Sequence, residues 1–308
     1  MDCDPGLDDA LAILLALGLP ETVAVKAIVA TFGNVGLRQT KNNLLRILSF
    51  FKESPLVGSG SSAPLKGRAQ EARYVHGKDG LGDIPSVFTK QVKSNFKNGI
   101  ELIKELALSN KIDKVILTGP LTDLARAVSA YGGKTQPVFL KNLDEIVIMG
   151  GTVFVKGNIT PYAEFNFHCD PEAAGIVLNS DVKKRLVSLD VTHKALLTDR
   201  HLKALKALKS PIAGFISYIA DYLIYSNKKR GFSGAPMHDP LAAAVAIKPD
   251  IGEYEALCLD VATRGKERGR VVLKKGKPNV IFCRKINTKK FFDLFIGALL
   301  KLAREERI

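Results

Sequence analysis

Apolar residues along this chain gather in short runs, separated by longer segments with helical spacing. Short runs that are rich in β-branched residues and bounded by glycine or polar turn residues predict buried strands. These runs are residues 23–32, 56–58, 114–117, 145–149 and 186–189. Apolar positions with helical spacing predict helices at residues 11–17, 36–51 and 121–130.

Strands alternate with helices along much of the chain, and each strand is nearly continuous in apolar residues. This pattern is typical of a parallel sheet that is covered by helices on both faces. We therefore predict an α/β, Rossmann-like fold with a mostly parallel central sheet flanked by helices. No linker poor in apolar residues divides the chain, so residues 1–308 are expected to form a single domain.

The last part of the chain adds smaller elements to this plan. Residues 208–248 are helical in pattern, with a glycine-rich interruption at 230–236 that we interpret as a mobile lid. Two apolar runs, 271–273 and 280–282, flank a Lys-Gly-Lys turn and predict a small C-terminal β-hairpin. The pattern then predicts a last helix at 288–304.

The composition argues against a membrane-spanning or disulfide-bonded protein. No segment approaches the run of about 18 apolar residues that a transmembrane helix needs. The amino end lacks the basic and apolar segments of a secretory signal. The cysteines are scattered without a C-x-x-C pair, which indicates reduced thiols and a cytoplasmic location. They are Cys3, Cys169, Cys258 and Cys283.

The net charge of +14 and the pI near 9.5 raise the question of a nucleic acid partner. Much of the excess lies between Arg264 and Arg307, where 14 Lys and Arg residues accompany 4 acidic residues. This segment has no aromatic interleaving, zinc-finger spacing or RNA-binding signature. We therefore interpret it as a solvated basic surface, with weak attraction of polyanions as the alternative, and expect no nucleic acid partner.

Four carboxylates crowd the first nine residues, around a Pro5-Gly6 turn. Carboxylates packed this closely repel one another, and their pKa values rise unless a cation lies among them. All-oxygen ligands on a flexible turn favour a hard cation such as Ca²⁺ or Mg²⁺ over zinc. The motif therefore predicts a metal-dependent enzyme. Its carboxylates are Asp2, Asp4, Asp8 and Asp9.

Other polar motifs follow the predicted strands. In parallel α/β folds, ligands bind at the carboxyl ends of the strands. We therefore expect these motifs to lie around one site together with the acidic residues. They are Gly33-Asn34, Thr118-Gly119, Gly150-Gly151 and Asp190.

Two further polar clusters complete the candidate chemistry. Asn158, Glu164 and Asn166 form a donor and acceptor set that suits sugar hydroxyls, although the asparagines are alternatively turn residues. Glu164 stands between apolar neighbours, where a carboxylate needs a partner. The motif His238-Asp239-Pro240 opens an apolar helix. Its aspartate is either a functional ligand or a helix N-cap, with the proline as the first helical residue.

Taken together, these motifs resemble the inosine-uridine-preferring nucleoside hydrolase family. The resemblance runs from Asp2 to the helix near Asp239 and fades in the basic C-terminal region. At the amino end it rests on Asp2-x-Asp4-Pro5-Gly6-x-Asp8-Asp9-Ala10. The further motifs are Gly33-Asn34, His76-Gly77-x-x-Gly80-Leu81-Gly82, Thr118-Gly119-Pro120-Leu121-Thr122, Met149-Gly150-Gly151, residues 158–166, Asp170-Pro171-Glu172-Ala173-Ala174, Leu189-Asp190-Val191-Thr192-His193 and His238-Asp239-Pro240.

The resemblance implies a Ca²⁺ site and hydrolysis of the N-glycosidic bond of ribonucleosides, as in nucleoside salvage. Asp4, Asp9 and Asp239 would hold the ion, together with a main-chain oxygen near Thr118. Ca²⁺ accepts irregular shells of about seven or eight oxygens, which suits the capture of a vicinal diol. Asp4 would also be the general base that activates water. The transition state would resemble an oxocarbenium ion.

The resemblance also implies which residues surround the ribonucleoside. His238 would donate a proton to the departing base, because imidazole titrates near neutrality. Phe165 would form a wall of the pocket, His76 would approach the base, and Tyr222 or Tyr225 would close over it. The residues that would hold the ribose are Asp8, Asn158, Glu164 and Asn166, with Asn34 at the rim.

The resemblance further narrows the substrate. Purine-specific members of the family stack the base between tryptophans, and this chain has no tryptophan. His238 resembles the pyrimidine-preferring or broad-specificity branch. We therefore expect uridine and cytidine as substrates, with inosine in a broader specificity and a purine-preferring enzyme as the alternative. A homo-oligomer, either a tetramer or a dimer, is also expected.

The amino end departs from the family. Only Met1 precedes Asp2, whereas members of the family normally place several apolar residues there as a first strand. We therefore expect a truncated strand, which would leave neighbouring backbone groups unpaired and the metal loop less rigid. Reduced stability or activity is the expected consequence.

Two other classes of function fit parts of the sequence. A Mg²⁺-dependent phosphatase of the haloacid dehalogenase type also places Asp-x-Asp after its first strand. It would need a later lysine and an acidic pair after a strand, and residues 145–151 end in Met-Gly-Gly instead. The other alternative is a non-enzymatic protein that only binds nucleosides, or binds RNA through its basic C-terminal region.

Overall fold

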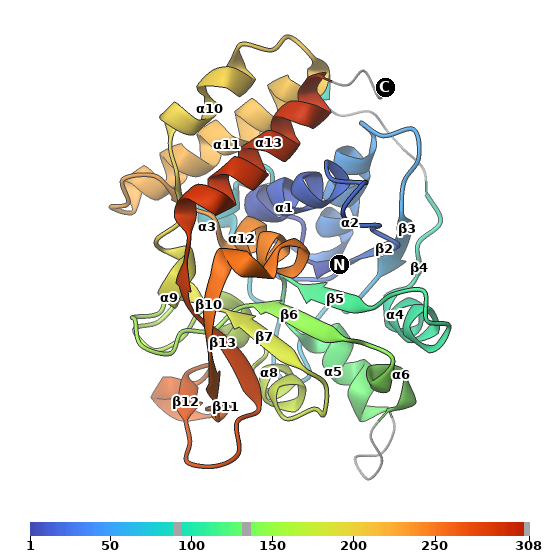
Figure 1. Ribbon diagram of the computed structural model, residues 1–308, viewed down its shortest axis with the longest axis vertical. Coiled ribbons are helices and arrows are strands. Elements are labelled where there is room, and N and C mark those ends of the chain that lie inside the picture. Colours follow the sequence, from blue (N-terminus) through green and yellow to red (C-terminus); the bar gives the residue numbers. More distant parts are fainter. Residues whose placement is uncertain (89–93, 131–136, 305–308) are drawn as a thin grey trace.

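A nine-stranded sheet runs through the centre of the computed structural model, which describes residues 1–88, 94–130 and 137–304 (Figure 1). Its strands are β1 (Asp2–Cys3), β2 (Ala27–Ala30), β3 (Leu56–Ser59), β4 (Lys97–Asn98), β5 (Lys114–Leu117), β6 (Glu145–Met149), β7 (Lys184–Val187), β10 (Gly252–Leu257) and β13 (Val280–Ile286). They lie in the order β10-β13-β7-β6-β5-β1-β2-β3-β4. Neighbours are parallel, except that β10 and β13 are antiparallel.

Helices and two small antiparallel pairs complete the described chain. The helices are α1 (Leu7–Leu17), α2 (Leu37–Leu48), α3 (Arg73–His76), α4 (Gly99–Leu108), α5 (Thr122–Ser129), α6 (Val138–Lys141), α7 (Phe165–Cys169), α8 (Pro171–Leu178), α9 (Leu189–Thr192), α10 (Asp199–Lys206), α11 (Pro211–Lys229), α12 (His238–Ile247) and α13 (Thr288–Arg304). The pairs are β8 (Leu196–Leu197) with β9 (Ala235–Pro236), and β11 (Leu259–Val261) with β12 (Val271–Leu273). Short 3₁₀ helices span Ser86–Phe88, Pro249–Ile251 and Gly265–Glu267.

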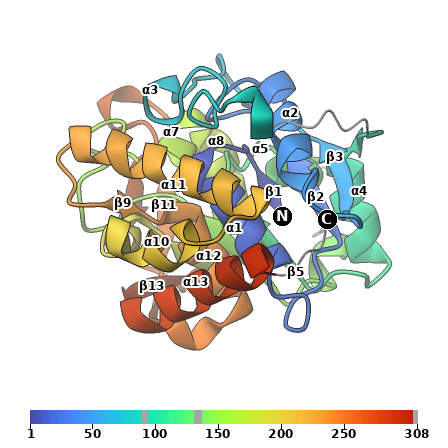
Figure 2. The ribbon, with the colours of Figure 1, turned by 90° about the horizontal axis from the view of Figure 1, so that it is seen from above.

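The two faces of the sheet are covered by different helices. In Figure 1, α1, α10, α11 and α13 lie above the sheet, and α4, α5, α6 and α8 lie below it; Figure 2 shows the upper group from above. Alternate residues of a strand point to opposite faces. In β6, Ile146 and Ile148 therefore belong to the lower core, whereas Val147 and Met149 belong to the upper one. The predicted parallel sheet flanked by helices is confirmed.

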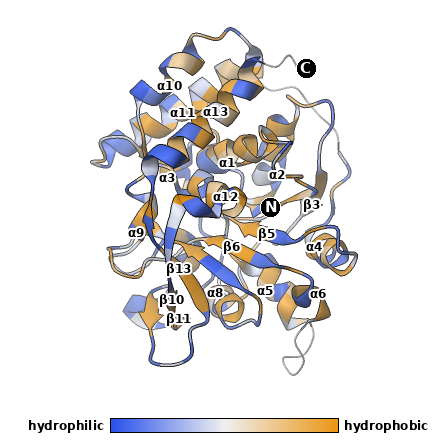
Figure 3. Ribbon diagram, viewed as in Figure 1, coloured by the Kyte–Doolittle hydropathy of each residue, from blue (hydrophilic) through white to orange (hydrophobic). Residues whose placement is uncertain are grey.

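Helices α1 and α12 are buried and pack against each other. Residues 241–246 of α12 (LAAAVA) are mostly small, which lets the two helices approach closely. In Figure 3 both helices are coloured mainly as hydrophobic, while α10 carries more hydrophilic residues. Each buried helix has acidic residues in its first turn, Asp8 and Asp9 in α1 and Asp239 in α12. The packing of two apolar helices thus brings these carboxylates together.

The direction in which strands are added reverses at β1. From β1 the chain builds β2, β3 and β4 on one side, and it then returns to place β5 on the other side. Asp2 is aligned with Val29 of β2 and with Leu117 of β5. Ligands bind at such a switch point, beyond the carboxyl ends of the strands. The loops after β1, β2 and β5, which hold several of the polar motifs, meet there.

The first strand is short but paired on both sides. β1 contains two residues, and the Met1 ammonium donates a hydrogen bond to the main-chain oxygen of Ala27 at 2.8 Å. Burial, as the largest effect, lowers the pKa of this ammonium. A groove of about 270 Å³ continues the line of β1 at its amino end, between residues 23–27 and 112–116.

The predicted strand 23–32 is longer than the one that forms. β2 spans Ala27–Ala30, because residues 23–26 border the groove instead of a neighbouring strand. By contrast, β5, β6 and α13 have the bounds that the sequence predicts.

The predicted C-terminal hairpin is wrong in its pairing. Residues 271–273 form β12, which pairs with β11 and not with residues 280–282. Residues 280–282 belong to β13, which enters the main sheet between β10 and β7. Long-range pairing with the main sheet therefore prevails over the local turn. No helix in the described part of the chain has both the length and the apolar character needed to cross a membrane.

Candidate active site

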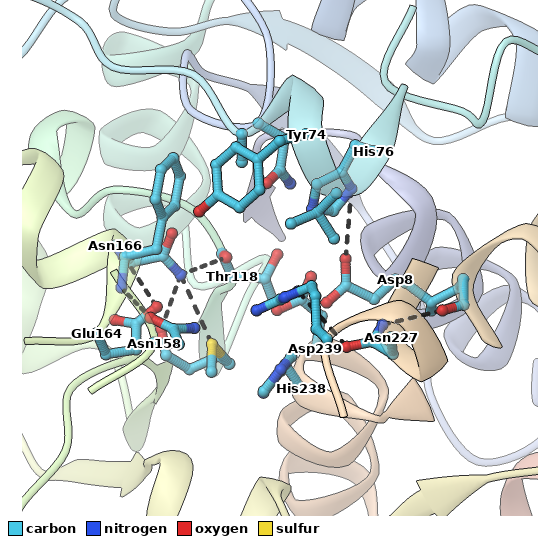
Figure 4. A pocket seen from close by; sticks show the side chains of 17 residues that line it. Asp8, Tyr74, His76, Thr118, Asn158, Glu164, Asn166, Asn227, His238 and Asp239 are labelled. Carbon is cyan, nitrogen blue, oxygen red and sulfur yellow. Dashed lines mark hydrogen bonds and ion pairs between the residues drawn. The ribbon is translucent and has the colours of Figure 1, made fainter. Parts of the chain in front are cut away.

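A narrow cavity of about 60 Å³ opens at the carboxyl ends of the strands, at the switch point. Figure 4 shows Asp8 and Asp239 on one side, Asn158, Glu164 and Asn166 on the other, and Thr118 between them. Most of the predicted site residues line it. These are Asp8, Asn34, His76, Thr118, Asn158, Glu164, Phe165, Asn166, His238 and Asp239.

Three buried carboxylates form the acidic side of the site. One oxygen each of Asp8, Asp9 and Asp239 lie within 4.8 Å of one another. Asp8 and Asp9 occupy the first turn of α1, and Asp239 occupies the first turn of α12. The positive ends of both helix dipoles therefore face the group, which favours negative charge there.

Asp4 lies beside this group in a cradle of backbone. Its Oδ2 accepts a hydrogen bond from the main-chain N–H of Asn34 at 2.6 Å, while Oδ1 is buried without a hydrogen-bond partner among the described residues. A Cβ at Gly33 would stand 1.9 Å from Oδ2, and one at Gly119 would stand 3.0 Å from Oδ1. A side chain at Gly33 would overlap the Asp4 carboxylate and one at Gly119 would crowd it, so these glycines let the strand-end loops close around Asp4.

Asp9 is held by hydrogen bonds from three segments. Its Oδ2 accepts from the main-chain N–H of Gly6 at 3.0 Å and from Asn34 Nδ2 at 2.9 Å, and its Oδ1 accepts from Thr118 Oγ1 at 2.9 Å. Asn34 Nδ2 also donates to the main-chain oxygen of Asp4 at 3.1 Å. Asn34 and Thr118 therefore fix the acidic group as well as line the cavity.

Burial raises the pKa of every carboxyl group in this set. The pKa of Asp8 rises to about 7, first through desolvation and then through the Asp9 carboxylate. Desolvation also raises the pKa of Asp9. For Asp4 and Asp239 the pKa lies well above its ordinary value, through desolvation and then through neighbouring carboxylates. Buried carboxylates in this state favour either a proton or a cation in their midst.

The donor set fits a hard divalent cation. All of its atoms are oxygens, and Oδ1 atoms of Asp4 and Asp8 are buried without hydrogen bonds among the described residues. Such unpaired carboxylate oxygens are costly unless a cation compensates them. The nearby main-chain oxygen of Thr118 accepts from Asn166 Nδ2 at 2.8 Å and retains a second lone pair.

Asp2 lies apart from the cavity. Desolvation, and then the neighbouring Asp123 carboxylate, raise the pKa of its carboxyl group well above the ordinary value. The structure thus brings three carboxylates of the acidic motif, Asp4, Asp8 and Asp9, to the site, whereas the fourth, Asp2, lies outside it.

Glu164 organises the amide side of the site. As the N-cap of α7, it accepts from the main-chain N–H groups of Asn166 and Phe167 at 2.9 and 3.2 Å. It also accepts from that of Gly151 at 2.8 Å. Desolvation nevertheless raises the pKa of Glu164 to about 7. The partner that this carboxylate needs is therefore supplied mainly by backbone.

The two asparagines are fixed in the same way. Asn166 Nδ2 donates to the main-chain oxygens of Thr118 and Met149 at 2.8 and 3.3 Å. Asn158 Oδ1 accepts from the main-chain N–H of Phe165 at 3.0 Å. The remaining polar atoms, Asn166 Oδ1 and Asn158 Nδ2, form no hydrogen bond with another described side chain, so an acceptor and a donor are available to a ligand.

Two histidines reach the cavity. His76 Nδ1 accepts from the main-chain N–H of Leu7 at 3.1 Å, and it lies 3.9 Å from Asp8 Oδ1. Desolvation, and then Arg230, lower the pKa of His76 to about 3. Desolvation is also the largest cause at His238, followed by His193 and then Arg230, and together they lower the pKa of His238 well below its ordinary value. Both rings are therefore neutral at pH 7.

The structure adds residues that the sequence did not single out. Tyr74 of α3 and the end of α11, with Asn227 and Arg230, line the cavity. The pattern of residues 230–236 indicated a mobile lid but did not single out Arg230, and no motif marked Tyr74 or Asn227. Tyr222 and Tyr225 lie on α11 outside the lining, and Tyr225 packs under Lys229 with the ammonium 4.3 Å from its ring centre.

Some motif residues serve the scaffold. Asp170 caps α8, accepting from Ala173 N at 3.0 Å, and Asp190 accepts from Val153 N and Phe154 N at 2.9 and 2.8 Å. The N-cap interpretation of Asp239 is wrong. α12 begins one residue earlier, at His238, and no side chain caps it, because the Asp239 carboxylate faces the cavity.

The chain belongs to the inosine-uridine preferring nucleoside hydrolase family, whose model matches residues 1–293. This is a family of enzymes, and the match extends over the sheet, the acidic group and the amide side of the cavity.

Curated relatives cover nearly the whole chain. The pyrimidine-specific ribonucleoside hydrolase RihA of Salmonella agona (strain SL483) is 36% identical, over 97% of this chain and 97% of the relative. The protein of the same name from Shewanella sp. (strain MR-4) is 34% identical, over 97% and 95%. Among solved structures, a purine-preferring ribonucleoside hydrolase from Gardnerella vaginalis has a TM-score of 0.89 at 27% identity, covering 98% of each chain.

Proposed function

We propose that this protein hydrolyses the N-glycosidic bond of ribonucleosides to free base and ribose, with Ca²⁺ as its cofactor and uridine and cytidine as preferred substrates. The observation that carries the proposal is a single cavity in which buried carboxylates from α1 and α12 face fixed amide groups. The first set suits a cation and a diol, and the second suits sugar hydroxyls.

Asp9 and Asp239 would hold the cation, together with Asp4, Asp8 and the main-chain oxygen of Thr118. When bound, Ca²⁺ supplies an electrophile that lowers the pKa of a water and binds the vicinal ribose hydroxyls. Asp4 is the general base. Its Oδ1 is the atom free to accept a proton from the attacking water, because Oδ2 is occupied by Asn34 N–H.

The opposite wall orients the sugar. Asn166 offers its Oδ1 and Asn158 offers its Nδ2, so one hydroxyl can donate while another accepts. Glu164 keeps the Asn166 segment in place through the N–H groups that it binds, and Asn158 is tied to the same segment by accepting from the Phe165 N–H. Holding the ribose between this wall and Asp8 exposes one face of the anomeric carbon to the attacking water.

Departure of the base needs help, because the base leaves with negative charge. His238 is neutral in its surroundings, so it helps as a hydrogen-bond donor and not as an imidazolium. Arg230, which lines the same cavity, adds a fixed positive charge on that side. This division of roles differs from simple proton donation by a histidine that titrates near neutrality.

The preference for pyrimidines rests on the names of the 34–36% identical relatives and on the absence of tryptophan. A purine-preferring enzyme is the second candidate, which the resemblance to the Gardnerella vaginalis structure favours. We also propose a role in nucleoside salvage in the cytoplasm, in keeping with four free cysteines, and a homo-oligomeric assembly.

The test is release of reducing sugar from uridine, cytidine, inosine and adenosine, compared as kcat/KM in the presence of Ca²⁺. The proposal expects uridine or cytidine to lead, with activity lost on Asp4→Asn and no turnover of p-nitrophenyl phosphate. Faster hydrolysis of inosine than of either pyrimidine would favour the second candidate. Turnover of p-nitrophenyl phosphate without release of sugar would overturn the proposal.

A further inference from the structure

A buried threonine stands behind His238. Thr192 is the last residue of α9, has no exposed surface, and places its Oγ1 2.8 Å from His238 Nδ1. We propose that Thr192 is a positioning residue that donates this hydrogen bond and holds His238 in the tautomer with its proton on Nε2. The role of that proton in catalysis rests on the proposed function, whereas its position on Nε2 rests on the geometry alone.

The surroundings of Thr192 decide the direction of the bond. A hydroxyl group carries one proton and must place it on an acceptor when it is buried. Among the described residues, His238 Nδ1 is the partner of Thr192 Oγ1. If Nδ1 carried the proton instead, the hydroxyl proton would be buried without an acceptor, which is unfavourable. The hydroxyl therefore donates, and the ring proton lies on Nε2.

The other ring nitrogen is free to act. Nε2 of His238 makes no hydrogen bond with the described residues, and the ring lines the cavity. The ring of His193 packs edge-on against it, with 5.7 Å between the ring centres. Thr192 and His193 thus hold the imidazole from behind, and its remaining N–H is presented to a ligand.

His76 offers an internal comparison. Its Nδ1 accepts from the Leu7 main-chain N–H at 3.1 Å, and a backbone N–H can only donate. The proton of His76 is therefore also on Nε2. The two histidines thus carry the ring proton on the same nitrogen, but a backbone N–H fixes this tautomer in His76, whereas the Thr192 side chain fixes it in His238.

The tautomer matters for the leaving group. As the glycosidic bond breaks, negative charge develops on the base, and an N–H donor stabilises it. The opposite tautomer would present a lone pair to the same atoms and repel them. Loss of the Thr192 hydroxyl should therefore reduce the rate of bond cleavage more than the binding of the nucleoside.

The direct test is the tautomer itself, read from ¹⁵N–¹H correlations of the histidine side chains in the full protein without substrate. The His238 signal is assigned by its absence in His238→Ala. We expect Nε2–H in the wild type and in Thr192→Ser, and a shift toward Nδ1–H in Thr192→Val. His76 should remain Nε2–H throughout. An Nδ1–H signal from wild-type His238 overturns the proposal, even if Thr192→Val fails to fold.

Kinetics provide the second readout. For uridine we expect Thr192→Val to lower kcat on the order of tenfold with little change in KM, and Thr192→Ser to restore it. p-Nitrophenyl riboside, whose leaving group needs no hydrogen bond, should be cleaved at a nearly unchanged rate. Equal losses on both substrates, or a change in KM alone, would contradict a positioning role. A wild type that cleaves no nucleoside would refute the proposed function while the tautomer measurement still decides the role of Thr192.

Discussion

The two ends of strand β1 open into cavities of opposite character. At its carboxyl end lies the candidate site, about 60 Å³, whose lining combines carboxylates, amides and histidines. At its amino end lies the larger groove, about 270 Å³, whose lining is mainly apolar side chains. We propose the smaller cavity as the active site, because its donor set and electrostatics point to a site more clearly than volume does.

The difference has a structural cause. At the carboxyl end, the amino termini of α1 and α12 and the strand-end loops contribute N–H groups and carboxylates to one place. At the amino end, the Met1 ammonium is buried against Ala27, and its pKa is lowered because desolvation disfavours the charge. The carboxyl end thus gathers charged and hydrogen-bonding groups, whereas the amino end is lined mostly by apolar side chains.

The largest expected effect comes from removing a carboxylate at the polar end. Asp239→Ala should lower kcat/KM for uridine by roughly 10³-fold or more, because α12 then contributes no ligand and the remaining oxygens cannot complete the cation shell. Metal analysis after dialysis should show loss of Ca²⁺. The matched control is Asp250→Ala, an exposed aspartate paired with Lys290, which should keep both activity and metal. Full Ca²⁺ occupancy in Asp239→Ala would contradict the assignment.

A smaller effect is expected from the histidine beside it. His238→Ala should lower the rate with inosine by about 10²-fold, in the range of a lost proton-transfer or hydrogen-bond partner. The loss with p-nitrophenyl riboside should be much smaller, because p-nitrophenolate leaves without help. Steady-state kinetics on both substrates decide the matter, and equal losses on the two would refute a role at the leaving group.

The stability of the protein without bound metal should depend on pH. In the folded protein the pKa values of Asp8 and Glu164 are raised to about 7, so both groups bind protons more tightly than in the unfolded chain. The stability that they contribute is present below their unfolded pKa values and is lost as pH rises through about 7. The buried histidines act in the opposite sense below about pH 6.5, because their pKa values are lowered on folding. The Tm of protein in EDTA should therefore fall between about pH 6.5 and pH 8.

Calcium should remove most of this dependence, because a cation replaces the protons among the carboxylates. At a free Ca²⁺ concentration of 100 Kd, the stabilisation should be about 2.7 kcal/mol. The measurement is thermal unfolding across this pH range with EDTA or CaCl₂, with MgCl₂ as the matched salt control. A Tm that rises with pH in EDTA, or that does not change when calcium is added, would contradict a cation site at the acidic group.

The smallest effect should come from the apolar end. Joining four apolar residues, such as Ile-Val-Ile-Val, to the amino end of Met1 should extend β1 into the groove and remove the buried ammonium. After the entropy cost of ordering them, the gain should be about 1 kcal/mol, or roughly 2 °C in Tm. A Gly-Ser-Gly-Ser extension is the matched control and should not stabilise. Equal Tm values for the two extensions would show that the groove does not accept a strand.

Local signals in the sequence were sufficient for most elements. The short apolar runs at 114–117 and 145–149 predicted β5 and β6, because a buried parallel strand needs apolar residues on both faces. The acidic motif and the His-Asp-Pro motif likewise pointed to Asp8, Asp9 and Asp239. Their chemistry is carried by residue type and short spacing, which can be read without knowing the fold.

Tertiary structure alone decided the pairings and part of the site. β12 and β13 separated into different sheets because long-range partners outweighed a local turn, and β2 is shorter than predicted because residues 23–26 border the groove instead of a neighbouring strand. Tyr74 and Arg230 reach the cavity through the docking of α3 and α11, for which no local motif exists. The sequence thus determined the elements and the chemical groups, whereas contacts between distant segments determined which groups meet, because packing energy depends on neighbours that lie far apart in the chain.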